Sequence, residues 1–331
     1  MYVPKKEKKA YKDQGAVRFR FQGKSAIGWQ DLVRGEIKFP AEEIEDFVIL
    51  KSDGYPTYNF AVVIDDALMK ISHVIRAEDH ISNTPKQIVL YQALGFELPE
   101  FSHLPLLRNP DRSKISKRKN PVALSWYRQE GYLPQALLNF LCLLGWSHPE
   151  DKEVFSLSEF VQAFDLKRAR KAGPIFNLEK LDWLNGVYIR ETQNSRLKTQ
   201  IWQFFEKKYS REMIGKVVPL IKDRIKKLSD FESLAGFFFS RPKVNKRLLT
   251  KNYQGHLKLA LDVLEKMKSW NLQSINKSLL LSINKNSFQT SDFFMDLRIA
   301  ITGKKITPPI NNSIALLGKK ESLARLKQVL D

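Results

Sequence analysis

Five basic side chains and two serines gather in residues 112–121, which read RSKISKRKNP. Lysine and arginine side chains at this density can neutralise phosphate charge, and a serine hydroxyl can add a hydrogen bond. A mobile loop of this composition could close over a phosphate ligand and reopen for its product. The alternative is a solvated turn, because Asn109-Pro110-Asp111 just upstream is a turn former and basic residues are usually exposed.

The familiar catalytic signatures are otherwise missing from the sequence. It contains no GxGxxG, GxxxxGKS, HExxH or GxSxG pattern. Histidines occur without metal-ligand spacing, at His73, His80, His103, His148 and His256. Each is more often a structural residue than a catalytic one, so the basic loop remains the main candidate for chemistry.

The elements that would position this loop follow a strand, helix, strand pattern. Residues 72–76 (SHVIR) and 101–108 (FSHLPLLR) read as apolar strands. Between them, ISNTPKQIVLYQALG predicts a helix capped by Asn83 or Thr84, with Pro85 in its first turn and Gly95 as its stop. This pattern is typical of a parallel α/β sheet, whose ligands bind at the carboxyl ends of the strands. The basic loop follows the second strand at that end.

The N-terminal stretch predicts a small separate sheet. Val17, Phe19 and Phe21 share one face of a strand that turns at Gly23. A second strand is expected at 46–50, and the Asp53-Gly54 turn signal predicts that residues 55–64 run back as a third. A short helix is then expected to start at Asp65-Asp66.

After Pro121 the sequence predicts helices and no convincing strand. LPQALLNFLCLLGW starts near Pro134 and ends near Gly145, and FNLEKLDWLNG has Asn177 as N-cap and Gly186 as stop. Apolar residues recur at helical spacing between 212 and 239 and again in the terminal ESLARLKQVL. Lysines occupy the opposite faces, so this half of the chain is expected to be helical and basic.

Composition limits the class of protein. The chain has 331 residues, 43% of them hydrophobic, which is enough for two or three domain-sized cores. No apolar run approaches the roughly 18 residues of a membrane span, and MYVPKKEKKAYK lacks the apolar stretch of a secretory signal, so we expect a cytoplasmic protein. The single cysteine, Cys142, excludes an intrachain disulfide and a cysteine zinc cluster.

Net charge points to a polyanionic partner. Residues 201–331 hold 25 Lys and Arg against 11 Asp and Glu, a net charge of +14 out of +19 for the whole chain. Nucleic acid is the commonest cytoplasmic polyanion. The alternative is a lysine-rich surface that is only solvated.

Residues 53–146, from DGYPTYNFAVVIDDALMKISHVIRAEDHISNTPKQ through HLPLLRNPDRSKISKRKNP to LLGW, closely resemble bacterial glutamyl-tRNA synthetase. The resemblance continues through FNLEKLDWLNGVYI to FFMDLRIAITG and covers essentially the whole chain. It implies the C-terminal half of a class I Rossmann-like parallel sheet, preceded by part of a connective insertion and followed by an α-helical anticodon-binding region. The implied boundaries are 1–50 for the insertion remnant, 51–122 for the sheet, 123–195 for a stem-contact domain and 196–331 for the anticodon domain.

The family's activity is ATP-dependent attachment of L-glutamate to tRNA through a glutamyl adenylate. By resemblance, KISKR is the class I signature loop, with Lys114, Ser116, Lys117 and Arg118 as its catalytic residues. Lys117 would stabilise charge on the triphosphate with Lys114 in support, and Ser116 would hydrogen-bond within the loop. The resemblance also implies ATP contacts at Lys117, Asp79 and Leu107, and glutamate contacts at Tyr58 and Arg76, the latter on the γ-carboxylate. The alternative for Arg76 is a surface ion pair with Glu78 or Asp79.

The implied ligands and partners are ATP with Mg²⁺, L-glutamate and tRNA(Glu), with tRNA(Gln) left open; no zinc site and no membrane are expected. The helical C-terminal half favours a bacterial-type glutamyl enzyme over the related glutaminyl enzyme, for which β-barrels are expected there. Its charge would then bind tRNA phosphates, while single-stranded anticodon bases are recognised by stacking and edge contacts.

One departure from the family is severe: residues 1–57 contain no sequence of the His-Ile-Gly-His type, the family's first ATP-contacting motif. Two smaller departures, Asn177 for the usual Asp and the loop ending Arg118-Lys119-Asn120, put little in doubt. Three hypotheses stay open: a truncated or incompletely read ligase gene, a split gene whose product docks with a separate N-terminal chain, and a non-catalytic tRNA-binding protein. On the first two, we expect the isolated chain to be inactive.

Overall fold

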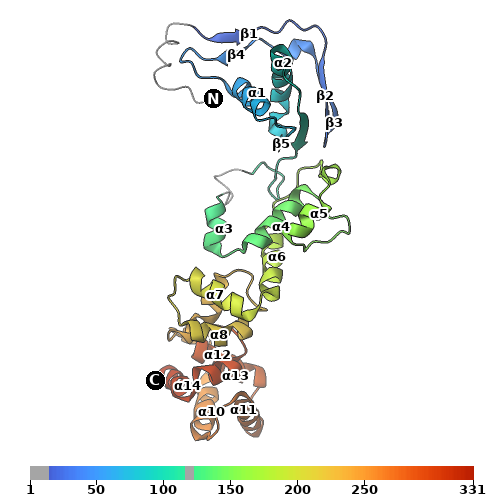
Figure 1. Ribbon diagram of the computed structural model, residues 1–331. Coiled ribbons are helices and arrows are strands. Elements are labelled where there is room, and N and C mark those ends of the chain that lie inside the picture. The colour runs from blue at the N-terminus through green and yellow to red at the C-terminus, as the bar shows by residue number, and fades with distance from the viewer. Residues whose placement is uncertain (1–14, 116–122) are drawn as a thin grey trace. The chain divides into compact units, whose positions relative to one another are not determined.

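The computed structural model describes residues 15–115 and 123–331 (Figure 1). Ser116, Lys117 and Arg118 of the basic loop lie outside the described residues. The chain divides into two compact units, Met1–Asn120 with Leu138–Asn177 and Pro121–Leu137 with Leu178–Asp331. Within the described ranges no helix is long and apolar enough to cross a membrane.

A four-stranded sheet in the first unit contains the predicted parallel strands. Strand β5 (His73–Ala77) pairs in parallel with β6 (Glu100–Leu104), which confirms the α/β reading of this stretch. The sheet continues through β2 (Ile27–Asp31) to β3 (Gly35–Phe39), in the order β3-β2-β6-β5. Its core is formed by Trp29, Ile88 and Phe101.

The β2–β3 hairpin is a feature that the sequence analysis did not predict. The two strands pair antiparallel over five positions, and Gly35 at the end of the turn has φ of 86°. The turn, LVRG, carries none of the Asn-Gly or Asp-Gly signals that mark tight hairpins. The hairpin joins β6 at one bridge, where Asp31 lies opposite Phe101 and the Leu32 N–H donates to the Phe101 carbonyl at 2.9 Å.

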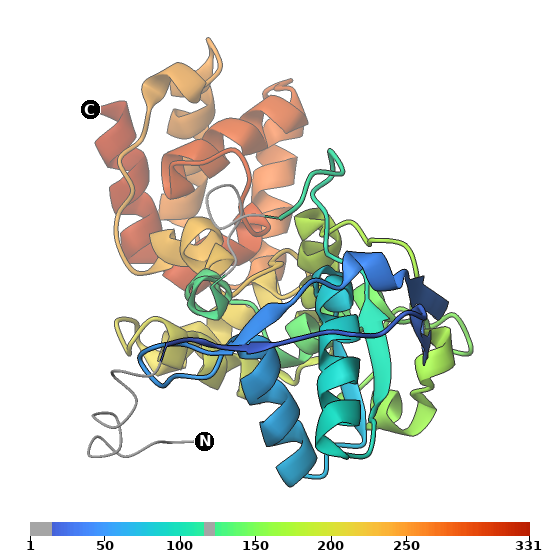
Figure 2. The same ribbon diagram turned by 90° about the horizontal axis from the view of Figure 1, so that it is seen from above.

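The predicted third strand at 55–64 is wrong. Most of these residues belong to a helix, α1 (Tyr58–Leu68), which also includes the start of the short helix expected from Asp65. Val63 of this helix is fully buried against α2, with Phe60 and Ala67 packed beside it. This spacing places one apolar face on α2, and that packing outweighs the strand preference of the valines and isoleucine. Figures 1 and 2 both show α1 and α2 side by side.

The other N-terminal predictions are partly confirmed. Strand β1 (Val17–Phe19) is shorter than expected and pairs antiparallel with β4 (Phe47–Leu50), which is the strand predicted at 46–50. A 3₁₀ helix, η2 (Ala41–Glu43), lies between β3 and β4.

The helix between the two parallel strands is as predicted. A 3₁₀ helix, η3 (Glu78–Asn83), follows β5 and leads into α2 (Thr84–Leu94). Asn83 is at the N-cap, Pro85 lies in the first turn, and Gly95 ends the helix in the left-handed conformation with φ of 69°. The rest of the first unit contains most of α4 (Pro134–Gly145), with α5 (Leu157–Ala163) and η4 (Leu166–Arg168).

The second unit has only helices among its described named elements, as the sequence predicted. They are α3 (Leu124–Glu130), α6 (Leu178–Glu191), α7 (Asn194–Phe204), α8 (Arg211–Ile221), α9 (Asp230–Ala235), η5 (Gly236–Phe238), η6 (Lys246–Leu248), α10 (Tyr253–Lys266), α11 (Leu272–Lys285), α12 (Thr290–Thr302), α13 (Ile310–Leu317) and α14 (Lys319–Leu330). They enclose two apolar cores, one around α7 and α8 and one around α10, α11 and α12.

Two details of the second unit differ from expectation. Gly186 does not stop α6, which continues to Glu191. A Cβ at Gly186 would lie 3.1 Å from Arg190 Nη1, the end of a flexible side chain, and 3.7 Å from the Lys226 Cα, so the backbone packing at this position does not require a glycine. The apolar spacing from 212 onward is also not one helix, because α8 ends at Ile221 while the buried Ile225 lies in the following turn.

Candidate active site

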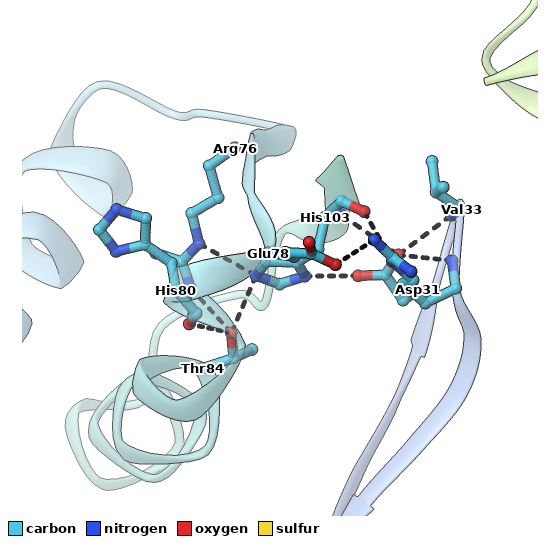
Figure 3. A network of polar contacts seen from close by, with 8 residues as sticks. Asp31, Val33, Arg76, Glu78, His80, Thr84 and His103 are labelled. Carbon is cyan, nitrogen blue, oxygen red and sulfur yellow. Dashed lines mark hydrogen bonds and ion pairs between the residues drawn. The ribbon is translucent and has the colours of Figure 1, made fainter. Parts of the chain in front are cut away.

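Arg76 is the centre of a hydrogen-bond network at the carboxyl end of β5 (Figure 3). Its Nε donates to His103 Nε2 at 3.1 Å, and its Nη2 donates to the Thr84 hydroxyl at 2.8 Å and to the His80 carbonyl at 3.5 Å. The guanidinium also lies 5.7 Å from the centre of the Phe101 ring. These contacts fix the plane of the guanidinium.

Tyr58 and Arg76, the two predicted glutamate contacts, are brought together by the fold. Tyr58 is the first residue of α1 and is 52% exposed. Burial lowers the pKa of Arg76, while the Tyr58 hydroxyl, through charge and hydrogen bonding, and then Asp66 oppose that shift. An exposed phenol beside a half-buried guanidinium is suited to binding a carboxylate.

His80 is a site neighbour that sequence reasoning did not single out. The Tyr58 hydroxyl lies 3.4 Å from His80 Nδ1, and the two rings are 5.7 Å apart. Asn83 Nδ2 lies 3.3 Å from the same ring nitrogen. His80 therefore sits on the Tyr58 side of the Arg76 site, within η3.

A buried pair, Asp31 and His103, supports Arg76 from the opposite side. No motif in the sequence indicates this pair. The two side chains have no exposed surface, and Asp31 Oδ2 lies 2.6 Å from His103 Nδ1. Burial acts to raise the pKa of Asp31, but hydrogen bonds from the Arg34 backbone, the His103 ring and the Val33 backbone lower it overall. Asp31 is therefore ionised at neutral pH.

Glu78 pairs with Arg34, which differs from the surface ion pair with Arg76 considered above. Its Oε1 accepts from the Leu106 N–H at 3.0 Å. Arg34 also donates to the His103 carbonyl at 3.2 Å. The contacts of Arg76 through Nε and Nη2 are instead with His103, Thr84 and His80.

The described part of the basic loop begins with a tight turn. The Asn109 N–H donates to the Ser113 carbonyl at 2.8 Å, and the Arg112 N–H donates to the Asn109 carbonyl at 2.8 Å. Arg112 has φ of 65°, and Lys114 is exposed just beyond the turn. The turn reading of Asn109-Pro110-Asp111 is therefore confirmed, and it does not exclude a phosphate-binding loop after it.

The remaining predicted ATP contacts follow the parallel strands. Asp79 is exposed in η3 after β5, and Leu107 is half-buried after β6. Both lie beyond the carboxyl ends of β5 and β6, where open parallel sheets bind ligands. Among the residues with described positions, no group of three or more His, Cys, Asp and Glu could hold a metal ion.

Family models match nearly all of the sequence. Residues 3–183 match tRNA synthetases class I (E and Q), catalytic domain, and residues 192–330 match an anticodon binding domain. The first match covers more than half of the chain and includes the Arg76 network and the basic loop.

Individual relatives give the same result. A glutamate–tRNA ligase of Acidothermus cellulolyticus is 40% identical over 96% of this chain and 66% of its own length. One from Fervidobacterium nodosum is 38% identical over 100% of this chain and 71% of its own length. This chain thus spans about two thirds of the length of the curated relatives.

A solved structure agrees with this assignment. The glutamate tRNA ligase from Elizabethkingia meningosepticum, crystallised in complex with its amino acid, superposes with a TM-score of 0.83 at 28% identity, covering 99% of this chain and 71% of that one. Sequence, fold and the order of the two domains all agree. The chain belongs to the glutamate–tRNA ligase family of class I tRNA synthetases.

Proposed function

We propose that this chain supplies the glutamate pocket, the signature loop and the tRNA-recognition region of a glutamate–tRNA ligase that acts in cytoplasmic protein synthesis. The observation that carries the proposal is the Arg76 site, in which His103 and Thr84 hold a half-buried guanidinium beside the exposed Tyr58. A guanidinium whose Nε and Nη2 are held in this way can pair through Nη1 with one carboxylate of a dicarboxylic amino acid. The γ-carboxylate of L-glutamate is the proposed ligand.

ATP, with its Mg²⁺ ion, is the proposed second substrate. Negative charge builds on the triphosphate as pyrophosphate leaves, and Lys117 with Lys114 and Arg118 would stabilise it. Ser116 would hydrogen-bond within the loop, while Asp79 and Leu107 would contact the nucleotide. Support for this assignment comes from the position of the loop after β6 and from the class I family match.

The second unit is proposed to bind tRNA(Glu). Residues 192–330 match an anticodon binding domain, and residues 201–331 have a net charge of +14. Lysine and arginine would neutralise backbone phosphates and release counterions. Binding of tRNA(Gln) by the same surface is the open alternative.

These 331 residues by themselves are proposed not to form the adenylate. They contain no sequence of the His-Ile-Gly-His type, so we infer that another segment, in the same or a separate polypeptide, provides it. Strand β5 is available for such a segment, because it is at the edge of the four described strands and its Ile75 is 51% exposed. An apolar edge strand of this kind favours pairing. A non-catalytic tRNA-binding protein is the second candidate.

The test is glutamylation of total bacterial tRNA by the purified chain, with a gel-shift measurement on the same tRNA. We expect binding without charging, and charging only after addition of a fragment that carries the missing motif. Lys117→Ala should abolish the restored charging and leave the gel shift nearly unchanged. Charging by the isolated chain that disappears with Lys117→Ala would overturn the proposed inactivity, and failure to bind tRNA would overturn the proposed function.

A further inference from the structure

We propose that Asp31 and His103 are positioning residues for Arg76: the carboxylate selects one tautomer of the imidazole, and the imidazole then aims the guanidinium at its ligand. The inference rests on the proposed function, because the ligand is taken to be the side-chain carboxylate of glutamate. Beyond that function, the pair explains the direction in which the Arg76 guanidinium points.

Asp31 is anchored before it meets the histidine. Its Oδ1 accepts from the N–H groups of Val33 at 3.0 Å, Arg34 at 2.9 Å and His103 at 3.2 Å. These bonds fix the carboxylate at the end of β2, so that Oδ2 is left to face the imidazole at 2.6 Å. A buried ionised oxygen at this distance requires a donor, and His103 Nδ1–H is that donor.

The tautomer of His103 follows from that bond. A neutral imidazole with its proton on Nδ1 has a lone pair on Nε2. Arg76 cannot accept a hydrogen bond, so the 3.1 Å contact between Arg76 Nε and His103 Nε2 requires that lone pair. A second proton, on Nε2, would oppose the Arg76 N–H and make the ring an imidazolium, which would place a second positive charge beside the guanidinium.

Thr84 supplies the second restraint. Its hydroxyl accepts from Arg76 Nη2 at 2.8 Å, and it lies 3.2 Å from both His103 Nε2 and the His80 carbonyl. Fixing Nε and Nη2 of a planar guanidinium fixes the direction of Nη1 as well. A preorganised guanidinium loses less entropy when a carboxylate binds.

The protonation state of His103 is consistent with this geometry. Burial lowers its pKa below the ordinary 6.5, Asp31 opposes that shift, and the charges of Arg76 and His80 add to it. The groups that face the ring are therefore Asp31 from β2, Arg76 from β5, His80 from η3 and the neutral Thr84 from α2. At pH 7 the ring is neutral, and acidification through its lowered pKa should weaken binding of glutamate.

Two substitutions test the roles of the two His103 ring nitrogens separately. The Oε1 of His103→Gln can replace Nε2 as acceptor for Arg76, whereas the side-chain amide of His103→Asn can replace only Nδ1–H toward Asp31. The matched control is His256→Asn, since His256 forms a similarly buried pair with Asp296 at 2.7 Å in the second unit. This control makes the same exchange at a buried His–Asp pair that does not contact Arg76.

The experiment is ¹⁵N NMR of the 331-residue chain at pH 7, followed by titration with L-glutamate. Ligand-free spectra should show a protonated Nδ1 and an unprotonated Nε2 at His103. His103→Asn should shift the Arg76 Nε–H resonance, speed its solvent exchange and weaken glutamate binding about tenfold, the effect of one hydrogen bond to a charged group. His103→Gln and His256→Asn should leave glutamate affinity within about threefold of wild type.

A His103 protonated on Nε2, or equal glutamate affinity in His103→Asn and wild type, would overturn the positioning role. Failure of the proposed function looks different: the tautomer would be as expected, but glutamate would leave the Arg76 Nε–H resonance of the wild type unmoved. That result would refute the glutamate pocket, and with it the positioning of Arg76 for glutamate.

Discussion

Replacing Asp31 by alanine should release the β2–β3 hairpin from the parallel sheet. The hairpin meets β6 through the Asp31–Phe101 bridge and the Leu32 N–H. Asp31 itself accepts four hydrogen bonds, two from its own turn and two from His103. Alanine would leave the buried His103 Nδ1–H without its acceptor.

The expected cost follows from these contacts. Hydrogen bonds to a charged group stabilise by about 1.5 to 3 kcal/mol each, but four of them do not add, and removing the carboxylate also removes its own cost of burial. Breaking a buried charged pair by removing one partner typically costs about 3 to 5 kcal/mol. At about 1.4 kcal/mol per factor of ten, the hairpin should open at least about a hundredfold more often.

The assay is hydrogen–deuterium exchange on peptides that cover residues 27–39, because local opening sets the exchange rate there. The matched control is Asp46→Ala, since Asp46 also accepts a backbone N–H, that of Phe21 at 2.8 Å, but its side chain is 46% exposed. The control should change stability by less than about 1 kcal/mol. If exchange in 27–39 accelerated no more in Asp31→Ala than in Asp46→Ala, the proposed role of Asp31 in holding the hairpin on the sheet would be refuted.

Three further outcomes are expected. The pKa of Glu321 is lowered from 4.5 to about 2, chiefly by a hydrogen bond from Arg241, so Glu321 contributes stability above pH 4.5 that is lost as pH falls toward 2. In thermal unfolding, Glu321→Gln should therefore cost about 1 to 2 kcal/mol at pH 7, after discounting for solvent screening, and much less at pH 2. Gly131 has φ of 82°, and a Cβ there would lie 2.8 Å from the Leu228 nitrogen, so Gly131→Ala should cost about 2 to 3 kcal/mol in urea unfolding. Gly95→Ala, which has open space around it, should cost about 1 kcal/mol. Raising salt from about 50 to 200 mM should weaken tRNA binding in a filter assay by at least tenfold, and a salt-independent affinity would contradict the phosphate-contact explanation.

Local signals predicted the elements around Arg76 well. Pro85 and Gly95 mark the two ends of α2, and the apolar runs on either side are β5 and β6. Such start and stop signals depend on backbone chemistry within a few residues, so they can be found without knowing the tertiary structure. The assignment of Tyr58 and Arg76 to one site came from the family resemblance, and the fold does bring them together.

The missed features depend on contacts between distant parts of the chain. Asp31 and His103 are 72 positions apart, and nothing in their local sequences pairs them. The Asp53-Gly54 turn signal predicts a strand at 55–64, but Val63 packs against α2, and α1 begins at Tyr58. Gly186 is predicted as a helix stop from its residue type alone, but α6 continues through it to Glu191.

The most direct test of the central claim is equilibrium binding of labelled tRNA(Glu) to the 331-residue chain, in competition with unlabelled tRNA(Phe) at about 150 mM salt. If the second unit recognises the anticodon, tRNA(Glu) should bind at least about tenfold more tightly than tRNA(Phe), beyond what phosphate contacts alone provide. Equal displacement by the two tRNAs would contradict the claim, because the +14 charge of residues 201–331 would then explain only a general attraction for polyanions.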